Sequence, residues 1–320
     1  MREVAFLQQN AEQWQHFEAM LEHRAHADPD ELAALFVRLT DDLAYAKTFY
    51  PGSKTAAYLN TLTSRAHQII YRNRKEQTNR FITFWQYELP RLLRETRVEL
   101  LCALLVFVLA ALLGALSTAN DDTFVRLILG DRYVNMTLEN IKQGDPLAVY
   151  KKMNEIDMFL GITFNNIRVS FFAFIAGAAL AFGTALILFY NGVMLGAFQY
   201  FFYQQNLLLA SLLTVWIHGT LEISAIIIAG SAGFVMGRGL LFPGTYTRGQ
   251  AFMHGAKKGL KIVVGLIPIF IAAGFLEGFV TRYTGMPALL SLGIIALSAA
   301  FIVYYFIIYP WLLNKRKVRS

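Results

Sequence analysis

The stretch VELLCALLVFVLAALLGAL (residues 98–116) holds a single charged residue, Glu99, near its start. A helix of about 20 apolar residues crosses the hydrocarbon core of a bilayer. This stretch therefore predicts a first membrane-spanning helix at residues 97–116, and it places the protein in the class of integral membrane proteins.

The composition supports the same class. Of 320 residues, 56% are hydrophobic and only 16% are charged, a balance that a soluble chain of this length rarely has. The net charge of +7 is best explained by basic residues on the cytoplasmic side of a membrane. We therefore expect contact with the lipid bilayer and no nucleic-acid partner.

Further apolar stretches predict an all-α, polytopic membrane protein with about six transmembrane helices. The later spans are expected at residues 170–190, at two places within 191–240, at 262–280 and at 288–311. The sequence leaves open whether 191–240 forms two full spans or contains a broken or re-entrant helix. Together these spans make up a predicted transmembrane bundle over residues 169–311.

The region before the first span, residues 1–96, is polar and predicts a soluble helical domain. Helical patterns cover residues 2–24, 28–49 and 54–71, and Asp28–Pro29 is typical of a helix start. Basic and aromatic residues mix near 79–96, which indicates an interfacial helix or, alternatively, a plain amphipathic linker.

Basic residues predict the topology. They are concentrated in the amino-terminal domain, in a predicted loop at 238–261 and in the tail at 312–320. An even number of spans places all three in the cytoplasm, together with both termini. The polar segment 117–168 is then extracytoplasmic.

Glycines spaced by four residues predict close packing of helices. The predicted packing positions are Gly192, Gly196, Gly233, Gly237, Gly274 and Gly278. Packing within the chain is favoured over a dimer face, although a homo-oligomer stays open. Gly255 and Gly259 show the same spacing within the predicted 238–261 loop, where it carries less meaning.

Three ionisable residues fall inside predicted spans: His218, Glu222 and Glu277. In WIHGTLEISAIIIAG (residues 216–230), His218 and Glu222 are one helical turn apart and can touch. Such groups are costly in a bilayer, about 3 kcal/mol each on insertion scales. They suit a structural hydrogen-bonded pair, a proton or ion relay, a metal site completed by another span, or catalysis.

Motifs for established chemistry are missing from the sequence. It has no HExxH, no GxSxG, no phosphate-binding loop and no glycine-rich dinucleotide turn. We therefore expect no cofactor, and a non-enzymatic role is favoured.

The stretch HGTLEISAIIIAGSAGFVMG (residues 218–237) resembles the signature of the stage II sporulation protein M family. His218, Gly219, Glu222 and Ala225 match that signature, whereas Ser224 stands where the family often has proline. The amino-terminal MREVAFLQQN, DDLAYAKTFYP (residues 41–51) and YLN (residues 58–60) resemble the soluble domain of the long members.

This resemblance implies a protein of the bacterial or archaeal inner membrane without an established chemistry. Namesakes anchor peptidoglycan-degrading partners during sporulation. Long members often accompany MoxR-type ATPases and von Willebrand A-like proteins, which suggests a subunit of an envelope complex. The leading hypothesis is thus a membrane scaffold. The alternatives are a transporter or channel lined by His218 and Glu222, and an intramembrane metal-dependent enzyme.

Overall fold

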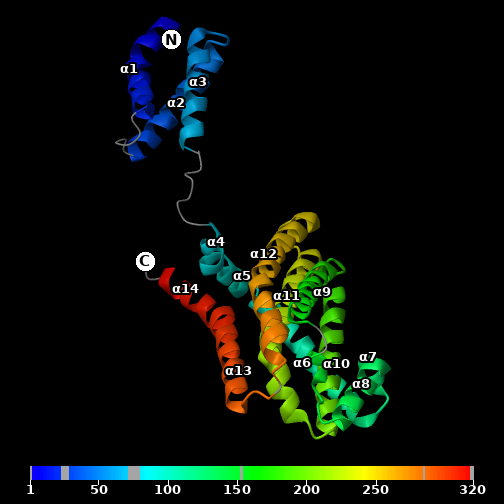
Figure 1. The fold of residues 1–320 in the computed structure, drawn as a ribbon. Coiled ribbons are helices and arrows are strands. Elements are labelled where there is room, and N and C mark those ends of the chain that lie inside the picture. The colour runs from blue at the N-terminus through cyan, green and yellow to red at the C-terminus, as the bar shows by residue number, and fades with distance from the viewer. Residues whose placement is uncertain (1, 23–28, 71–79, 152–153, 284, 318–320) are drawn as a thin grey trace. The chain divides into compact units, whose positions relative to one another are not determined.

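The computed structural model describes residues 2–22, 29–70, 80–151, 154–283 and 285–317. Every regular element in these ranges is a helix, which confirms the predicted all-α class (Figure 1). The chain divides into two compact units, Met1–Asn79 and Arg80–Ser320.

The first unit contains three helices, α1 (Glu3–Glu22), α2 (Pro29–Phe49) and α3 (Lys54–Ile70). Their bounds agree closely with the predicted helices, although the predicted cap Asp28 lies outside the described residues. The helices share an apolar core that includes Phe6, Trp14, Phe17, Leu39, Leu59 and Leu62. This unit therefore has the buried core expected of a folded helical domain.

The second unit contains six helical segments that are long and apolar enough to cross a membrane, as predicted. They are α6 (Arg97–Asn120), α9 with η4 (Glu155–Ala178), α10 (Phe182–Gln204), α11 (Leu208–Leu241), α12 with η5 (Arg248–Thr281), and α13 (Ala288–Ile302) continued by η6 (Val303–Ile308) and α14 (Tyr309–Lys317). The prediction of two spans within 191–240 was wrong: this stretch holds the end of α10 and most of α11, and the break falls just before α11.

The two ends of this bundle carry different short elements (Figure 1). The segment α4 (Arg80–Thr83), η2 (Phe84–Glu88) and α5 (Leu89–Glu95) lies at the end where α14 finishes, which we call the α5 side. The elements α7 (Phe124–Leu129), α8 (Asp131–Lys142) and η3 (Ala148–Lys151) follow α6 at the opposite end, the α8 side. A small core that contains Val125, Val134, Phe201 and Phe202 holds this segment against α10.

The second span was predicted at residues 170–190, and that position was wrong. The chain turns within this stretch, at η4 (Ala176–Ala178), and Ala181 adopts a left-handed backbone with φ of 67°. Only apolar residues surround the turn, so a hydropathy average over this stretch does not detect it. Asn165, Asn166 and Arg168 within α9 lower its hydropathy to 1.4, against 2.8 for α6. The predicted outward segment 117–168 therefore ends earlier, before Glu155.

The predicted basic loop at 238–261 is also largely wrong, because most of it is helical. α11 continues to Leu241 and α12 begins at Arg248. Thr247 caps α12: its hydroxyl accepts from the Gln250 amide at 3.4 Å, and its own amide donates to Gln250 Oε1 at 3.2 Å. Gly255 and Gly259 consequently lie within a helix.

The expected interfacial segment belongs to the second unit and not to the first. Trp85 Nε1 donates to the Gly265 carbonyl at 3.2 Å, and Leu89 is fully buried. Glu88 pairs with Lys261, and Glu95 pairs with Lys258 at 2.7 Å. The segment is thus packed along α12.

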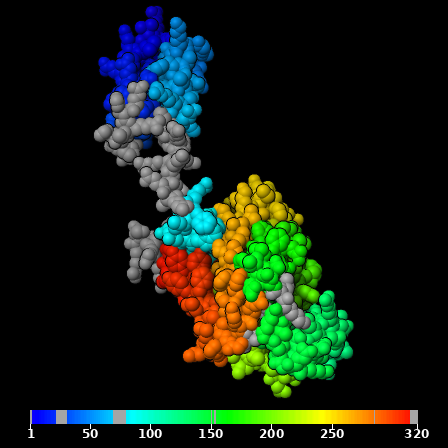
Figure 2. All heavy atoms as spheres, in the orientation of Figure 1, coloured from blue at the N-terminus to red at the C-terminus, as the bar shows by residue number. Residues whose placement is uncertain are grey.

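α11 is the central helix of the bundle. In its most apolar window 67% of residues are buried, against 17% for the carboxy-terminal span, which lies at the edge in the space-filling view (Figure 2). Glycines allow helices of the bundle to approach closely: a Cβ at Gly233 on α11 would overlap Thr184 on α10, and one at Gly196 on α10 would overlap the Ala111 carbonyl on α6. All six predicted packing glycines, Gly192, Gly196, Gly233, Gly237, Gly274 and Gly278, lie at such contacts within the chain.

Candidate functional site

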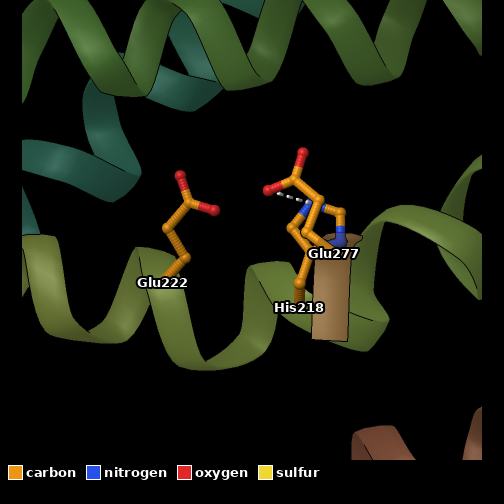
Figure 3. A group of neighbouring side chains, drawn as sticks. All are labelled: His218, Glu222 and Glu277. Carbon is orange, nitrogen blue, oxygen red and sulfur yellow. Dashed lines mark ion pairs between the residues drawn. The ribbon is translucent and has the colours of Figure 1, made fainter. Parts of the chain in front are cut away.

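His218 and Glu222 project from the same face of α11, which passes through both positions without a break (Figure 3). Glu277 comes from a different span, in the turn η5 (Leu276–Thr281) that continues α12. Tertiary packing therefore brings together all three ionisable residues that the sequence singled out.

At the site, the imidazole of His218 faces the carboxylate of Glu277. His218 Nε2 and Glu277 Oε2 are 3.7 Å apart, and their side chains are only 6% and 13% exposed. The sequence had suggested Glu222 as the partner of His218. Figure 3 shows the Glu222 carboxylate beside this pair, on the same side of α11.

Thr281, which sequence analysis did not identify, orients the imidazole. Its hydroxyl lies 3.0 Å from His218 Nδ1 and donates its proton to the Leu276 carbonyl at 3.2 Å. The hydroxyl therefore accepts from Nδ1–H, an assignment that follows from this network. In this tautomer Nε2 carries the lone pair, and this nitrogen faces Glu277.

These groups form a donor set that suits a metal ion. One ligand atom from each of His218, Glu222 and Glu277 lies within 4.8 Å of the other two. Ligands of one zinc ion, each about 2.1 Å away, can be at most about 4.2 Å apart. The side chains would therefore close slightly around an ion, and one imidazole with two carboxylates is a donor set that zinc, manganese and iron accept.

A second feature that the sequence analysis missed is a polar face on α9. Thr163, Asn166 and Ser170 are buried, and the Thr163 hydroxyl, the Asn166 amide nitrogen and the Ser170 hydroxyl have no hydrogen-bond partner among the described residues. Asn166 lies close enough to interact with Glu222. These polar residues are spaced by three and four positions in an apolar helix, and this spacing would have predicted that they share one face.

A cavity of about 510 Å³ connects the site to the α8 side of the bundle. Its lining includes His218 and Glu222 of the site and Ile128, Leu129 and Tyr133 of the α7–α8 segment. Burial raises the pKa of Tyr133 above its ordinary value, so this phenol is neutral. The cavity is large enough for a small ligand.

Toward the α5 side, α11 continues into an apolar cluster. Ile226, Ile228, Ala229, Ala232 and Met236 are buried there against residues such as Leu188, Ile262, Leu266 and Phe270. The site thus has polar surroundings and a cavity on one side, and tightly packed apolar side chains on the other.

These features define a polytopic helical membrane protein with a shielded site of three ionisable residues. Residues 103–282 match the family described as stage II sporulation protein M, and the chain belongs to that family. Residues 4–72 match a domain of unknown function (DUF8413). No curated protein and no solved structure matches the chain. The predicted family is confirmed. α11 is an uninterrupted α-helix through Ser224.

Proposed function

We propose that this chain is an integral membrane protein that binds a divalent metal cation at His218, Glu222 and Glu277. One observation carries the proposal: ligand atoms from two different spans converge within 4.8 Å in a shielded part of the bundle. Two ionised carboxylates repel each other in such surroundings, and a divalent cation neutralises both. The His218 imidazole supplies the third ligand, a neutral one.

The surrounding residues favour a metal over the other roles considered for this site. A purely structural pair needs no third ionisable group, and each such group costs about 3 kcal/mol on insertion. A relay or channel needs a polar path to both sides, whereas the α5 half around α11 is mostly apolar. The buried hydroxyls of Thr184 and Ser231 in that half bond to backbone carbonyls. A metal-dependent enzyme agrees with the cavity that reaches the α8 side, and its chemistry would depend on the same ion.

Metal content of the purified protein tests the proposal. The full chain is solubilised in mild detergent, analysed for zinc, manganese and iron, stripped with a chelator and titrated with zinc. We expect about one zinc per chain and, for Glu277→Gln or Glu222→Gln, at least about tenfold weaker binding.

Glu139→Gln provides the matched control, because Glu139 is an exposed carboxylate on α8. This variant should bind zinc like the wild type, and all variants should elute as single species in gel filtration. A wild-type chain that binds no metal, or a Glu277→Gln variant that binds it unchanged, would falsify the proposal.

As a second function, we propose a scaffold role in an envelope complex of the bacterial or archaeal inner membrane. The observation that favours it is that polar chain outside the spans forms two cores, one in the first unit and one around α7 and α8. Each can present a folded surface to partners. The candidates are MoxR-type ATPases, von Willebrand A-like proteins and cell-wall hydrolases.

A mild-detergent pull-down from native membranes at native expression level, read by mass spectrometry, tests this role. Recovery of unrelated subunits in fixed ratio supports the scaffold. Recovery of the chain alone, or with further copies of itself, argues against it and leaves the metal proposal unaffected.

A further inference from the structure

An apolar groove of about 480 Å³ runs along the bundle between α5, α6, α11 and the carboxy-terminal span. Its lining includes Leu101, Leu104, Ile227, Ile302 and Phe306. Two cationic residues, Arg94 and Arg97, also line it. This apolar groove and its two guanidinium groups take no part in the site around His218.

The carboxylates closest to these arginines in the sequence pair with other cations. Glu95 contacts Lys258 at 2.7 Å, and Glu99 accepts from Arg238 at 2.5 Å. Neither Arg94 nor Arg97 forms an ion pair within the described ranges 2–22, 29–70, 80–151, 154–283 and 285–317. Two positive charges at the groove are therefore left without an acidic partner from this part of the chain.

Both arginines lie at one end of the groove. Arg97 begins α6, and Leu104 on the same helix is about 10 Å deeper in the bundle by helical rise. Pro310 and Trp311, near the end of the carboxy-terminal span, line the same groove, and tryptophan favours the depth of the lipid headgroups. The arginines thus lie at the depth of the lipid phosphates, at the headgroup end of a groove that suits an acyl chain.

We propose that this groove binds one anionic phospholipid, whose phosphate contacts Arg94 and Arg97 and whose acyl chain lies along Leu101, Leu104 and Phe306. Ordinary lipid contact accounts for the apolar lining. It does not account for two guanidinium groups at one mouth that form no ion pair with the described residues, and guanidinium is the side-chain group best matched to phosphate oxygens.

Native mass spectrometry of the delipidated full chain tests the proposal. Dioleoyl phosphatidylglycerol and dioleoyl phosphatidylcholine are added separately at equal concentration. We expect a one-lipid adduct that is markedly more abundant with phosphatidylglycerol. The double variant Arg94→Gln/Arg97→Gln should bind phosphatidylglycerol about thirtyfold more weakly, because each arginine near anionic lipid contributes about one kcal/mol.

Two comparisons make the result specific. Arg80→Gln/Arg91→Gln removes as many charges from the same segment but outside the groove, and should leave binding unchanged. Leu101→Trp keeps both arginines and fills the groove, and should also weaken binding of phosphatidylglycerol.

Three results would overturn the proposal. The first is equal retention of the two lipids, or of neither. The second is unchanged binding by Arg94→Gln/Arg97→Gln. The third is full competition by soluble glycerol 3-phosphate, which would indicate a phosphate site that does not use the groove.

Discussion

His218 Nε2 and Glu277 Oε2 lie 3.7 Å apart although the two residues belong to different membrane spans. The contact ties α11 to the end of α12, and Thr281 on the same turn fixes the imidazole from its other side. Ligand orientation by such outer contacts commonly changes metal affinity by about 10- to 100-fold.

Thr281→Val therefore tests whether this contact matters for metal binding. The variant keeps the shape of the side chain but removes the oxygen that accepts from Nδ1–H. We expect zinc affinity to fall about tenfold or more while the protein stays folded. Thr220→Val is the control, because the Thr220 hydroxyl bonds to the Trp216 carbonyl of its own helix. Equal affinities in the two variants would contradict the assigned tautomer.

Gly196→Ala should destabilise the bundle. The added Cβ would overlap the Ala111 carbonyl oxygen on α6, and a backbone atom cannot rotate away. Overpacking of this kind costs about 1–3 kcal/mol, which should lower the thermal midpoint of the detergent-solubilised protein. Gly293→Ala meets nothing within 4 Å and should change the midpoint little. A midpoint for Gly196→Ala no lower than that of Gly293→Ala would refute the packing argument.

Arg238→Gln should destabilise the contact between α6 and α11. Glu99 is 7% exposed in its side chain, and Arg238 is 61% exposed, so the pair is intermediate between a buried and a surface pair. We expect the free energy of unfolding to fall by about 1–3 kcal/mol, since a carboxylate is left buried without its cation. Adding Glu99→Gln should restore part of that loss. Arg126→Gln breaks the more exposed pair with Asp131 and should have a smaller effect.

The predicted orientation can be tested by cysteine labelling in a Cys102→Ala background. Leu127 on α7 is 79% exposed, and Tyr246 between α11 and α12 is 57% exposed. If the α5 side is cytoplasmic, Leu127→Cys should react with an impermeant maleimide in intact cells, and Tyr246→Cys only after lysis. The reverse pattern would place the α5 side outside.

The sequence by itself determined the class of the protein and most of its helices. Apolar stretches long enough to cross a bilayer are a local property, so six spans and the three amino-terminal helices were predictable. The turn at η4 was not, because it interrupts an apolar run without a proline or a charge. The segment with Trp85 and Leu89 was assigned to the wrong unit for a related reason: amphipathic sequence does not specify what it packs against.

At the site, too, the sequence determined some features and the tertiary structure determined others. The sequence determined that three ionisable residues lie in apolar helices, because burying them requires a partner of some kind. Only the tertiary structure decided that Glu277 and Thr281 contact His218 and that Asn166 lies near Glu222. The periodicity of a helix fixes the neighbours of a residue along its own span. Which faces of different spans meet depends on how glycines and side chains pack in three dimensions.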